Sequence, residues 1–555
     1  MGKIEATQEQ IDAINYAGSM VVIAKPGSGK TYVVSEKVRA VLEESNPYQG
    51  VIAISYTNKA SDELMKRCKI GGRDLHSSFL GTIDTFCTRE IIRPFLPHLW
   101  SKPIIQPEVL SLVDISDRAF TEIKDIVGKK SISLPLLKEN TGLVREYFLD
   151  GILILEALGA LALYVLQNSS ACKNYFSARY THIFIDEYQD SGIDQHQLFL
   201  ELVELGLTGV AVGDADQSIY GYSGRIPEYL LSLPKRKDFR KFNLTVNHRC
   251  DPSIRNYSML LVDPDYICES CDSIHVYEKQ TIGNIDSISR WIDENISNII
   301  EYYGVGKLCD VAVLVKSNKN AHRIDMSLQT SHRCFYRSNL ESSFSQWTQL
   351  LALLLRYKFE AKMNAEEVID SVPVSFNSRD KRVLRSKLKL IRQTEEHHPD
   401  FINLCLEVCE KIHPNGKSDA AIESFTETLK DNKQMLLFHP ANDDEVQIMT
   451  LHKAKGLEFD VVFHLDLYEW VIPFKSFRKL PNDKSVSDNS KRDLAQGTNL
   501  HYVGITRARK ACFLCWSSLR YNSMGEVKQA NQSEFLDIHR LCDKRIFLHG
   551  DFADR

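Results

Sequence analysis

The chain has 555 residues, with 68 Lys and Arg against 73 Asp and Glu, a formal charge of −5 and 43% hydrophobic residues. This length allows about three or four domains with substantial cores, which excludes a small scaffold held together by disulfides. The net negative charge argues against a histone-like coating of DNA, so any nucleic-acid binding must come from local grooves. The 13 scattered cysteines, an odd number, and the polar N-terminal segment predict a cytoplasmic protein.

The first part of the chain alternates apolar runs with helical patterns. Residues 21–24 and 51–55 are short apolar runs typical of buried parallel strands. A helical pattern follows each of them, over residues 30–44 and from about residue 60. This alternation predicts a parallel sheet that is covered by helices.

A mainly helical insertion is predicted from about residue 91 to residue 178. Its most apolar stretch, residues 151–166, is shorter than the ~20 residues needed to cross a bilayer, so we expect a buried helix there. Two more apolar runs, over residues 182–186 and 209–213, then continue the predicted sheet.

A second α/β domain is predicted from a later set of apolar runs. A helical block over residues 341–439 interrupts it, and residues 475–496, rich in Ser, Asn, Asp and Lys, are typical of a flexible loop. The strands predicted for this domain are residues 310–316, 446–449, 461–465 and 511–516.

A glycine-rich segment, Ala-Lys-Pro-Gly-Ser-Gly-Lys-Thr, lies between the first predicted strand and helix. Its glycines allow backbone N–H groups to surround phosphates at a helix N-terminus. We expect Lys30 to reach the β and γ phosphates of a nucleotide and Thr31 to ligate Mg²⁺. Ala24 stands where the strict pattern has glycine, which leaves an ordinary glycine-rich turn as the alternative. The predicted nucleotide-binding residues of this segment are Ala24, Lys25, Pro26, Gly27, Ser28, Gly29, Lys30 and Thr31.

Two adjacent acidic residues, Asp186 and Glu187, come at the end of the apolar run over residues 182–186. Carboxylates at a buried strand end are unfavourable unless a cation or a reaction uses them. We therefore expect Asp186 to hold Mg²⁺ together with Thr31, and Glu187 to orient and deprotonate an attacking water. A solvated strand end is the alternative for either acid alone.

With these two motifs, the chain resembles the UvrD/Rep type of superfamily 1 DNA helicase, whose motifs recur in order along almost the whole length. The matching segments are Gln10 and residues 24–31, 55–60, 81–86, 183–190, 212–220, 244–249, 446–459 and 502–507. The resemblance implies an α/β fold of two RecA-like parallel-sheet lobes, 1A and 2A, each with a mostly helical insertion, 1B and 2B. The implied boundaries are 1–90 and 179–247 for 1A, 91–178 for 1B, 248–340 and 440–555 for 2A, and 341–439 for 2B.

The resemblance also implies the roles of residues around the nucleotide. Gln217 would couple the γ-phosphate to DNA, and Arg249 and Arg507 would be arginine fingers that make hydrolysis depend on closure of the lobes. Lys30, Glu187, Gln217, Arg249 and Arg507 form the predicted catalytic set. Gln10, His248, Glu458 and the two arginines would join residues 24–31 in binding ATP.

The DNA contacts implied by the resemblance lie in several motifs. Tyr56 and Tyr222 would stack on successive bases of single-stranded DNA without reading sequence, and core packing or a capped surface ring is the alternative. The implied DNA-binding residues are Tyr56, Thr57, Asn58, Phe86, Tyr222, Thr450 and His452.

Some positions depart from the family's pattern. The change at Ser223 puts in doubt one polar contact of the coupling region, and the change at His248 puts in doubt the strength of adenine discrimination. The departures are Asp84 in place of histidine, Ser223 in place of an arginine, with Arg225 two positions later, His248 in place of tyrosine, and Gln496-Gly-Thr-Asn499 in place of Glu-Glu-Arg-Arg.

Both insertions are short for the family, which indicates dependence on a partner. A closer resemblance is carried by three segments, residues 90–95, 183–191 and 498–503. In these segments the chain is similar, among short members, to the helicase subunits of Gabija anti-phage systems. This implies an ATP- and Mg²⁺-dependent motor with 3′ to 5′ polarity on single-stranded DNA or on tailed or ended duplexes. It also implies an OLD-type nuclease, with an ATPase and a Toprim domain, as the partner.

Two other functions stay open. The chain could be a DNA-activated NTPase sensor that licenses a partner nuclease without processive unwinding, or a non-catalytic scaffold. The complete set of predicted catalytic residues speaks against the scaffold.

Two remaining patterns have competing interpretations. The basic run over residues 379–392 is either a solvated helix face or a contact with duplex DNA or a partner. A metal cluster is not expected at Cys268 and Cys271 or at Cys512 and Cys515, since the sulfurs of the second pair fall on opposite faces of a predicted strand.

Overall fold

The computed structural model divides into two compact units. Unit 1 comprises Met1–Ala215, Tyr220–Val246 and Ser338–His439, and unit 2 comprises Asp216–Ile219, Asn247–Arg337 and Pro440–Arg555. The residues that the structure describes are 6–56, 58–69, 74–105, 107–111, 132–221, 225–342, 345–372, 376–414, 416–475, 485–522 and 524–554.

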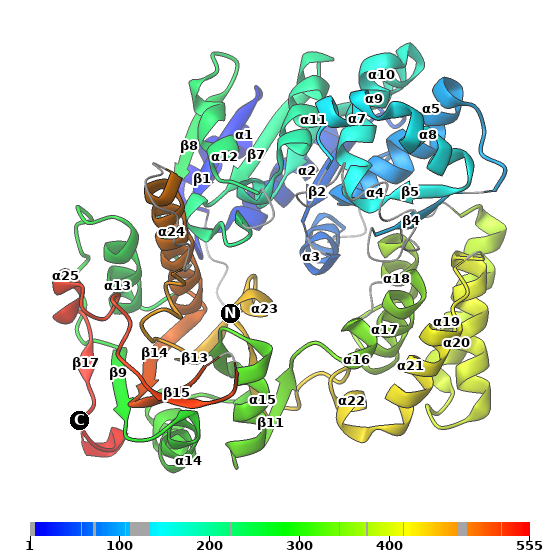
Figure 1. Cartoon of the computed structure of the whole chain (residues 1–555). Coiled ribbons are helices and arrows are strands. Elements are labelled where there is room, and N and C mark those ends of the chain that lie inside the picture. The colour runs from blue at the N-terminus through cyan, green and yellow to red at the C-terminus, as the bar shows by residue number, and fades with distance from the viewer. Residues whose placement is uncertain are drawn as a thin grey trace. The chain divides into compact units, whose positions relative to one another are not determined.

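Unit 1 contains a parallel sheet whose strands, among the described residues, follow the order β3-β2-β6-β7-β1-β8 (Figure 1). The four apolar runs predicted for this sheet form β1, β2, β6 and β7. Two strands were missed, because β3 has only four residues and β8 is mostly exposed. The strand bounds are β1 Met20–Ala24, β2 Gly50–Ser55, β3 Phe79–Thr82, β6 Tyr180–Ile185, β7 Thr208–Gly213 and β8 Arg240–Leu244.

Alternating side chains of these strands enter two different cores. Val21, Ile52 and Ile183 belong to one buried cluster, whereas their neighbours Val22 and Phe184 belong to another on the opposite face. This alternation follows from the period of two along a strand, and it explains why the runs are apolar throughout. The helices α1 Gln8–Asn15, α2 Lys30–Glu44 and α3 Asn58–Cys68 contribute residues to the second cluster.

The first insertion shares its core with one face of this sheet. Within residues 151–166, Ile152–Ile154 form a short strand, β5, paired with β4 Glu108–Leu110, and the predicted buried helix begins at Leu158. No helix in the described parts of the chain has the length and apolar character needed to cross a membrane. The helices that follow β3 and precede β7 are α4 Ile83–Phe86, α5 Arg93–Trp100, α7 Leu134–Glu139, α8 Thr141–Leu149, α9 Leu158–Asn168, α10 Ser170–Arg179 and α11 Ile193–Glu204.

The second helical block has a core of its own and gathers into one bundle (Figure 1). Although the chain enters and leaves the block from segments of unit 2, the block packs with unit 1. Lys66 of α3 and Glu367 of the block form an ion pair at 2.8 Å. The block contains α16 Asn339–Ser342, α17 Gln346–Phe359, α18 Ala365–Ser371, α19 Ser378–Gln393, α20 Pro399–Ile412, α21 Asp419–Lys430 and α22 Asn432–Leu436.

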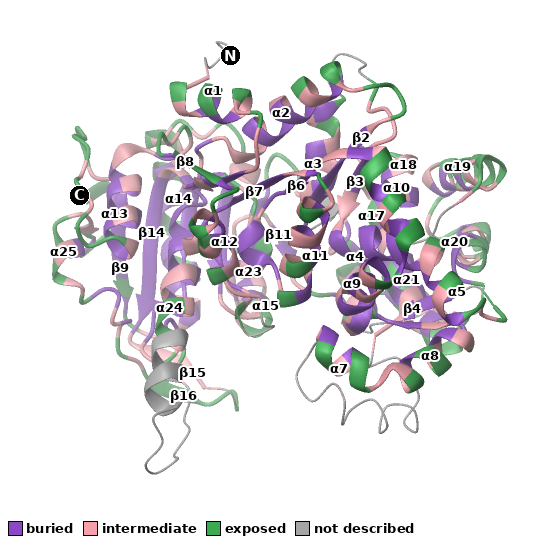
Figure 2. Ribbon diagram, turned by 90° about the horizontal axis from the view of Figure 1, so that it is seen from above, coloured by how far each residue is buried: buried purple, intermediate pink, exposed green. Residues whose placement is uncertain are grey.

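Unit 2 contains a second parallel sheet, with the described strands in the order β11-β12-β10-β13-β14-β9-β17. Its four predicted strands are present, and Figure 2 shows β14 almost wholly buried. The two sheets confirm the predicted α/β class. The strand bounds are β9 Val276–Thr281, β10 Val311–Val315, β11 His332–Phe335, β12 Val446–Thr450, β13 Phe459–His464, β14 Ala508–Ser517 and β17 Ile546–Phe547.

The loop predicted over residues 475–496 is corrected in its second half. Helix α24 spans Ser485–Ile505, so residues 485–496 are helical, while residues 476–484 lie outside the described residues. Local composition favoured a loop, but the helix is packed against α13 and α23 of unit 2. The other helices of this unit are α13 Pro252–Val262, α14 Ile285–Tyr302, α15 Asn318–Ser327, α23 Leu451–Ala454 and α25 His539–Cys542.

Candidate active site

The glycine-rich segment forms the turn between β1 and α2. Gly27 and Gly29 have φ of 72° and 81°, in the left-handed region that glycine adopts without strain. Gly29 is the residue before α2 and has no side chain to cap the helix, so the first N–H groups of α2 have no cap from it. Ser28 Oγ donates to Lys25 O at 2.7 Å and stabilises the turn. The arrangement is suited to binding an anion at the start of α2.

Gln10 lies directly against this turn. Its Nε2 donates to Ser28 O at 2.9 Å, and its Oε1 accepts from Thr7 N at 3.0 Å. A Cβ on Gly29 would lie 2.6 Å from Gln10 Nε2. The Gln10 amide, which the resemblance implies in binding ATP, therefore supports the glycine-rich turn in this structure.

The acidic pair follows β6 as expected. Asp186 is only 5% exposed, and its Oδ1 accepts from Glu187 N at 2.9 Å. Burial and the neighbouring Glu187 raise the pKa of Asp186 to about 7, against the opposing effect of Lys30. Glu187 has φ of 55°, a strained conformation for a residue with a side chain. The structure thus holds a buried carboxyl group near Lys30, followed by an acidic residue whose backbone is strained.

Gln189, which the sequence interpretation missed, connects this pair to the next motif. Its Nε2 donates to Glu187 Oε2 at 2.5 Å, and its Oε1 accepts from Asp214 N at 3.0 Å. A Cβ on Gly213 would lie 2.4 Å from Gln189 Oε1, so a larger residue here would displace the Gln189 amide. The position of Gln189, two residues after Glu187 in the sequence, was the signal that could have identified it.

The donors in this part of unit 1 fit Mg²⁺. Hard cations of this size prefer carboxylate and hydroxyl oxygens, as Asp186 and Thr31 offer. A carboxyl whose pKa is raised by burial is a group that a cation would stabilise in its ionised form.

Unit 2 brings together the two predicted arginine fingers. Arg507 is 1% exposed, and it donates to Val503 O at 3.1 Å, to Leu457 O at 3.2 Å and to Gln217 Oε1 at 3.3 Å. Arg249 Nη2 pairs with Glu458 Oε1 at 2.5 Å, and its Nη1 donates to Thr506 O at 3.4 Å. Both arginines therefore already have acceptors in unit 2.

His248 is exposed and precedes Arg249 in an irregular segment. Asn247 Oδ1 accepts from the backbone N of Arg249 at 2.7 Å and from that of Cys250 at 3.0 Å, which fixes the turn. The imidazole is thus exposed, with no described contact to hold it.

The predicted DNA contact Tyr56 is already covered on its ring. Its hydroxyl bonds Ser191 Oγ, and the guanidinium of Arg225 lies 5.6 Å from the ring centroid of Tyr56 and 5.9 Å from that of Tyr220. Arg225, two positions beyond the family's usual arginine, therefore reaches the aromatic rings of two motifs. Desolvation by burial raises the pKa of Asp84, and the positive charge of Arg225 partly opposes this rise.

The remaining predicted DNA contacts differ in their surroundings. Phe86 is corrected to a core residue: it is 0% exposed and packs against Phe79 and Phe176, because its helix faces the insertion. Thr450 caps α23 by accepting from Lys453 N at 3.3 Å. His452 has a pKa lowered by burial and by nearby lysines, and it bonds the backbone of Ile219.

Three more of these residues cannot be placed. Thr57 and Tyr222 lie outside the described residues, and Asn58 begins α3 without a described side chain.

The basic run is now α19, and several of its cations are paired within the helical block. Arg385 pairs with Glu366, Lys387 with Glu407, and Arg392 donates to the carbonyls of Tyr357, Glu360 and Met363. Among the described residues, Arg379, Arg382 and Lys389 have no such partner and are exposed. For the paired cations, the run therefore needs no contact with duplex DNA or with a partner to explain its charges.

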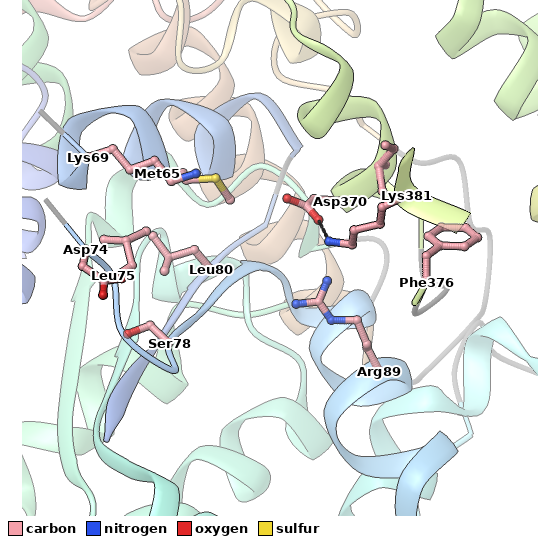
Figure 3. Close-up of a pocket in the computed structure, with 11 residues that line it drawn as sticks. Met65, Lys69, Asp74, Leu75, Ser78, Leu80, Arg89, Asp370, Phe376 and Lys381 are labelled. Atoms are coloured by element: carbon pink, nitrogen blue, oxygen red, sulfur yellow. Dashed lines mark ion pairs between the residues drawn. The ribbon is translucent and has the colours of Figure 1, made fainter. Parts of the chain in front are cut away.

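A cavity of about 510 Å³ lies in unit 1 between α3 and β3 on one side and α18 and α19 on the other. In Figure 3 the Arg89 guanidinium points towards the ion pair that Lys381 and Asp370 form at 3.6 Å. Arg89 also lies 5.0 Å from the Phe79 ring centroid. The cavity marks the incomplete packing of the block against the sheet.

Two family models match the chain and together cover more than half of it. A model of the AAA domain matches residues 7–223, and a model of the UvrD-like helicase C-terminal domain matches residues 377–519.

Similar proteins align over nearly the whole chain. The Gabija protein GajB of Bacillus cereus (strain VD045) is 27% identical over 94% of this chain and 97% of its own length. The ATP-dependent DNA helicase Rep of Buchnera aphidicola subsp. Schizaphis graminum is 22% identical over 97% of this chain and 98% of its own. The ATP-dependent DNA helicase PcrA of Staphylococcus aureus is 21% identical over 92% and 83% respectively.

Proposed function

The chain belongs to the UvrD-like superfamily 1 DNA helicases, which depend on ATP, and we propose that it is the motor of an anti-phage defence complex. In this proposal it moves 3′ to 5′ on single-stranded DNA and acts with an OLD-type nuclease. The observation that carries the ATPase part is the buried carboxyl group of Asp186, which interacts electrostatically with Lys30 of the glycine-rich turn. The N-cap residue Gly29 leaves the start of α2, where Lys30 lies, without a side-chain cap. The similarity to GajB over nearly its whole length supports the defence role.

The residues of unit 1 would bind and activate. Backbone N–H groups at the start of α2 and the Lys30 ammonium would hold the β and γ phosphates. Thr31 and Asp186 would hold Mg²⁺, which supplies neutralisation of phosphate charge when bound. Glu187 would accept a proton from the attacking water. The strained backbone of Glu187 and its hydrogen bond from Gln189 would orient the carboxylate.

The residues of unit 2 would stabilise the transition state. Phosphoryl transfer spreads charge over the γ-phosphate oxygens, so guanidinium groups increase the rate most when they are present at that moment. Arg249 and Arg507 would supply this charge, and Gln217 would link it to the DNA-dependent state of the protein.

The test is ATP hydrolysis with and without single-stranded DNA. We expect severalfold stimulation by DNA, and a loss of about two to three orders of magnitude in Lys30→Ala, because a preorganised cation is removed. Lys237, an exposed lysine of unit 1, gives a matched control as Lys237→Ala. Hydrolysis that ignores DNA, or unchanged turnover in Lys30→Ala, would refute the proposal.

A second candidate is a DNA-activated ATPase that licenses the nuclease without processive unwinding. It is favoured by the direct bond between Arg507 and Gln217, which offers a route for DNA to control hydrolysis. Strand displacement on a duplex with a 3′ tail, measured with the chain alone and with a purified OLD-type nuclease added, separates the two. ATP hydrolysis without displacement in both mixtures supports the sensor.

A further inference from the structure

We propose that Gln496 and Asn499 are positioning residues that hold residues 216–219 on α24 and so set the contact between Gln217 and Arg507. The inference rests on the proposed function, since it names side chains through which DNA would control hydrolysis. Both residues lie where the chain departs from the family's usual Glu-Glu-Arg-Arg.

The path of the chain at this point is unusual. Ala215 and Tyr220 belong to unit 1, whereas the four residues between them pack with unit 2. Asp214, just before the segment, is bonded through its N–H to Gln189, which in turn bonds Glu187. Along the chain, the segment therefore comes shortly after a residue that is hydrogen-bonded to Gln189.

Three successive carbonyls of the segment accept hydrogen bonds from unit 2. Lys455 Nζ donates to Gln217 O at 2.9 Å. Asn499 Nδ2 donates to Ser218 O at 2.9 Å, and Gln496 Nε2 donates to Ile219 O at 3.2 Å. Ser218 and Ile219 are buried, so their carbonyls need these partners.

The amide side chains match this task chemically. Residues 496 and 499 are three apart and so face the same side of α24. A carbonyl needs a donor, which an amide supplies and a glutamate at position 496 would not. Thr498, between them, bonds Leu494 O of its own helix at 2.9 Å instead.

The consequence falls on Gln217. Its Oε1 accepts from Arg507 Nη2 at 3.3 Å, so the side chain is aimed only while the backbone of the segment is held. If the amides are lost, the segment is free to shift, and both the Arg507 contact and the link to Gln189 are disturbed. We expect the rate of ATP hydrolysis at saturating DNA to fall, and the affinities for ATP and DNA to stay unchanged.

The experiment uses Asn499→Asp and Gln496→Glu, which keep shape but replace the donor by an acceptor. With the full chain and single-stranded DNA, we expect kcat at saturating DNA to fall about tenfold. The KM for ATP and the DNA concentration giving half-maximal stimulation should stay within about twofold of wild type, since neither ligand loses a contact. Asn499→Gln, which keeps the amide, should recover most of the rate, and Thr498→Ala is the matched control.

The outcomes separate this inference from the proposed function. A wild-type protein that DNA does not stimulate refutes the proposed function itself. A stimulated wild type with Asn499→Asp and Gln496→Glu indistinguishable from Thr498→Ala overturns the positioning role. If thermal unfolding shows that Asn499→Asp does not fold, Gln496→Glu, at a half-buried position, is the decisive variant. An unchanged kcat in Gln496→Glu would then overturn the positioning role.

Discussion

The charged groups of unit 1 and unit 2 are prepared in opposite ways. In unit 1, Lys30 donates one long hydrogen bond, to Ala24 O at 3.4 Å, and the pKa of Asp186 is raised by burial and by Glu187. In unit 2, Arg507 and Arg249 are each bonded to acceptors of their own unit.

This difference assigns different work to the two units. Groups held without full compensation favour the arrival of a ligand that compensates them, here the phosphates and a cation. Groups already paired are rigid, and rigid charges act best as preorganised stabilisers of a transition state. We therefore expect changes in unit 1 to affect nucleotide binding and activation, and changes in unit 2 to affect turnover alone.

The largest effect should come from Glu187→Gln in unit 1. The amide cannot accept the proton of the attacking water, so we expect hydrolysis to fall by about 10²–10⁴-fold with nucleotide binding retained. Turnover and binding of a fluorescent nucleotide are measured, with Glu44→Gln at the exposed end of α2 as control. Equal turnover in the two variants would remove Glu187 from the mechanism.

Next in size is Arg507→Lys in unit 2. Lysine cannot reproduce the planar set of donors, so we expect hydrolysis to fall by about 10²–10³-fold while nucleotide affinity is kept. The free energy of unfolding of the variant should also be about 1–3 kcal/mol lower, because Leu457 O, Val503 O and Gln217 Oε1 lose a donor. Loss of nucleotide binding together with folding would indicate a purely structural arginine.

A stability change in unit 2 with no charge involved comes from Gly504→Ala. The added Cβ would lie 2.8 Å from His464 Cδ2 and 2.8 Å from Leu451 Cδ2, inside a packed core. Overpacking of this kind costs about 1–3 kcal/mol, which denaturant unfolding measures. In unit 1, Gly142→Ala on α8 meets nothing within 4 Å and should be neutral or stabilising. Equal effects of the two substitutions would contradict the packing described for α24.

The smallest effect is a pH dependence confined to unit 1. Burial and the neighbouring Glu187 raise the pKa of Asp186 from an ordinary value of 3.8 to about 7 in the folded chain, so the folded state binds more protons between these values. Stability without ligands should therefore fall as pH rises from about 4 to about 7 on account of this group. Asp186→Asn removes this loss, and its Tm advantage over wild type should grow by a few degrees between pH 5 and pH 8.

That measurement is made without nucleotide or Mg²⁺. Addition of Mg²⁺ and nucleotide should reduce the advantage, because bound ligand stabilises the ionised carboxylate of the wild type. A Tm difference that stays constant with pH would show that Asp186 is not strained by burial.

The strands that could be predicted are those that are buried on both faces of the sheet. Val311–Val315 of β10 is apolar throughout for this reason. β9 escaped prediction because it carries Glu278 and Lys279, which read as surface residues. In the fold Glu278 pairs with Arg545 at 2.5 Å, and Lys279 donates to Gly550 O at 2.7 Å. Partners more than 250 residues away make these charges tolerable in the core, and local composition carries no sign of them.

Local patterns in the sequence were enough to predict the fold class, and to predict that a glycine-rich turn and an acidic pair follow two of the strands. These depend on local spacing, because a strand, a glycine turn and a helix start are set by neighbouring residues. Only the tertiary structure decided that Phe86 lies in the core, that Gln189 bridges Glu187 to Asp214, and that Gln496 and Asn499 hold the segment at Gln217. The reason is physical: a hydrogen bond needs both partners, and the chain brings the second from a distant element.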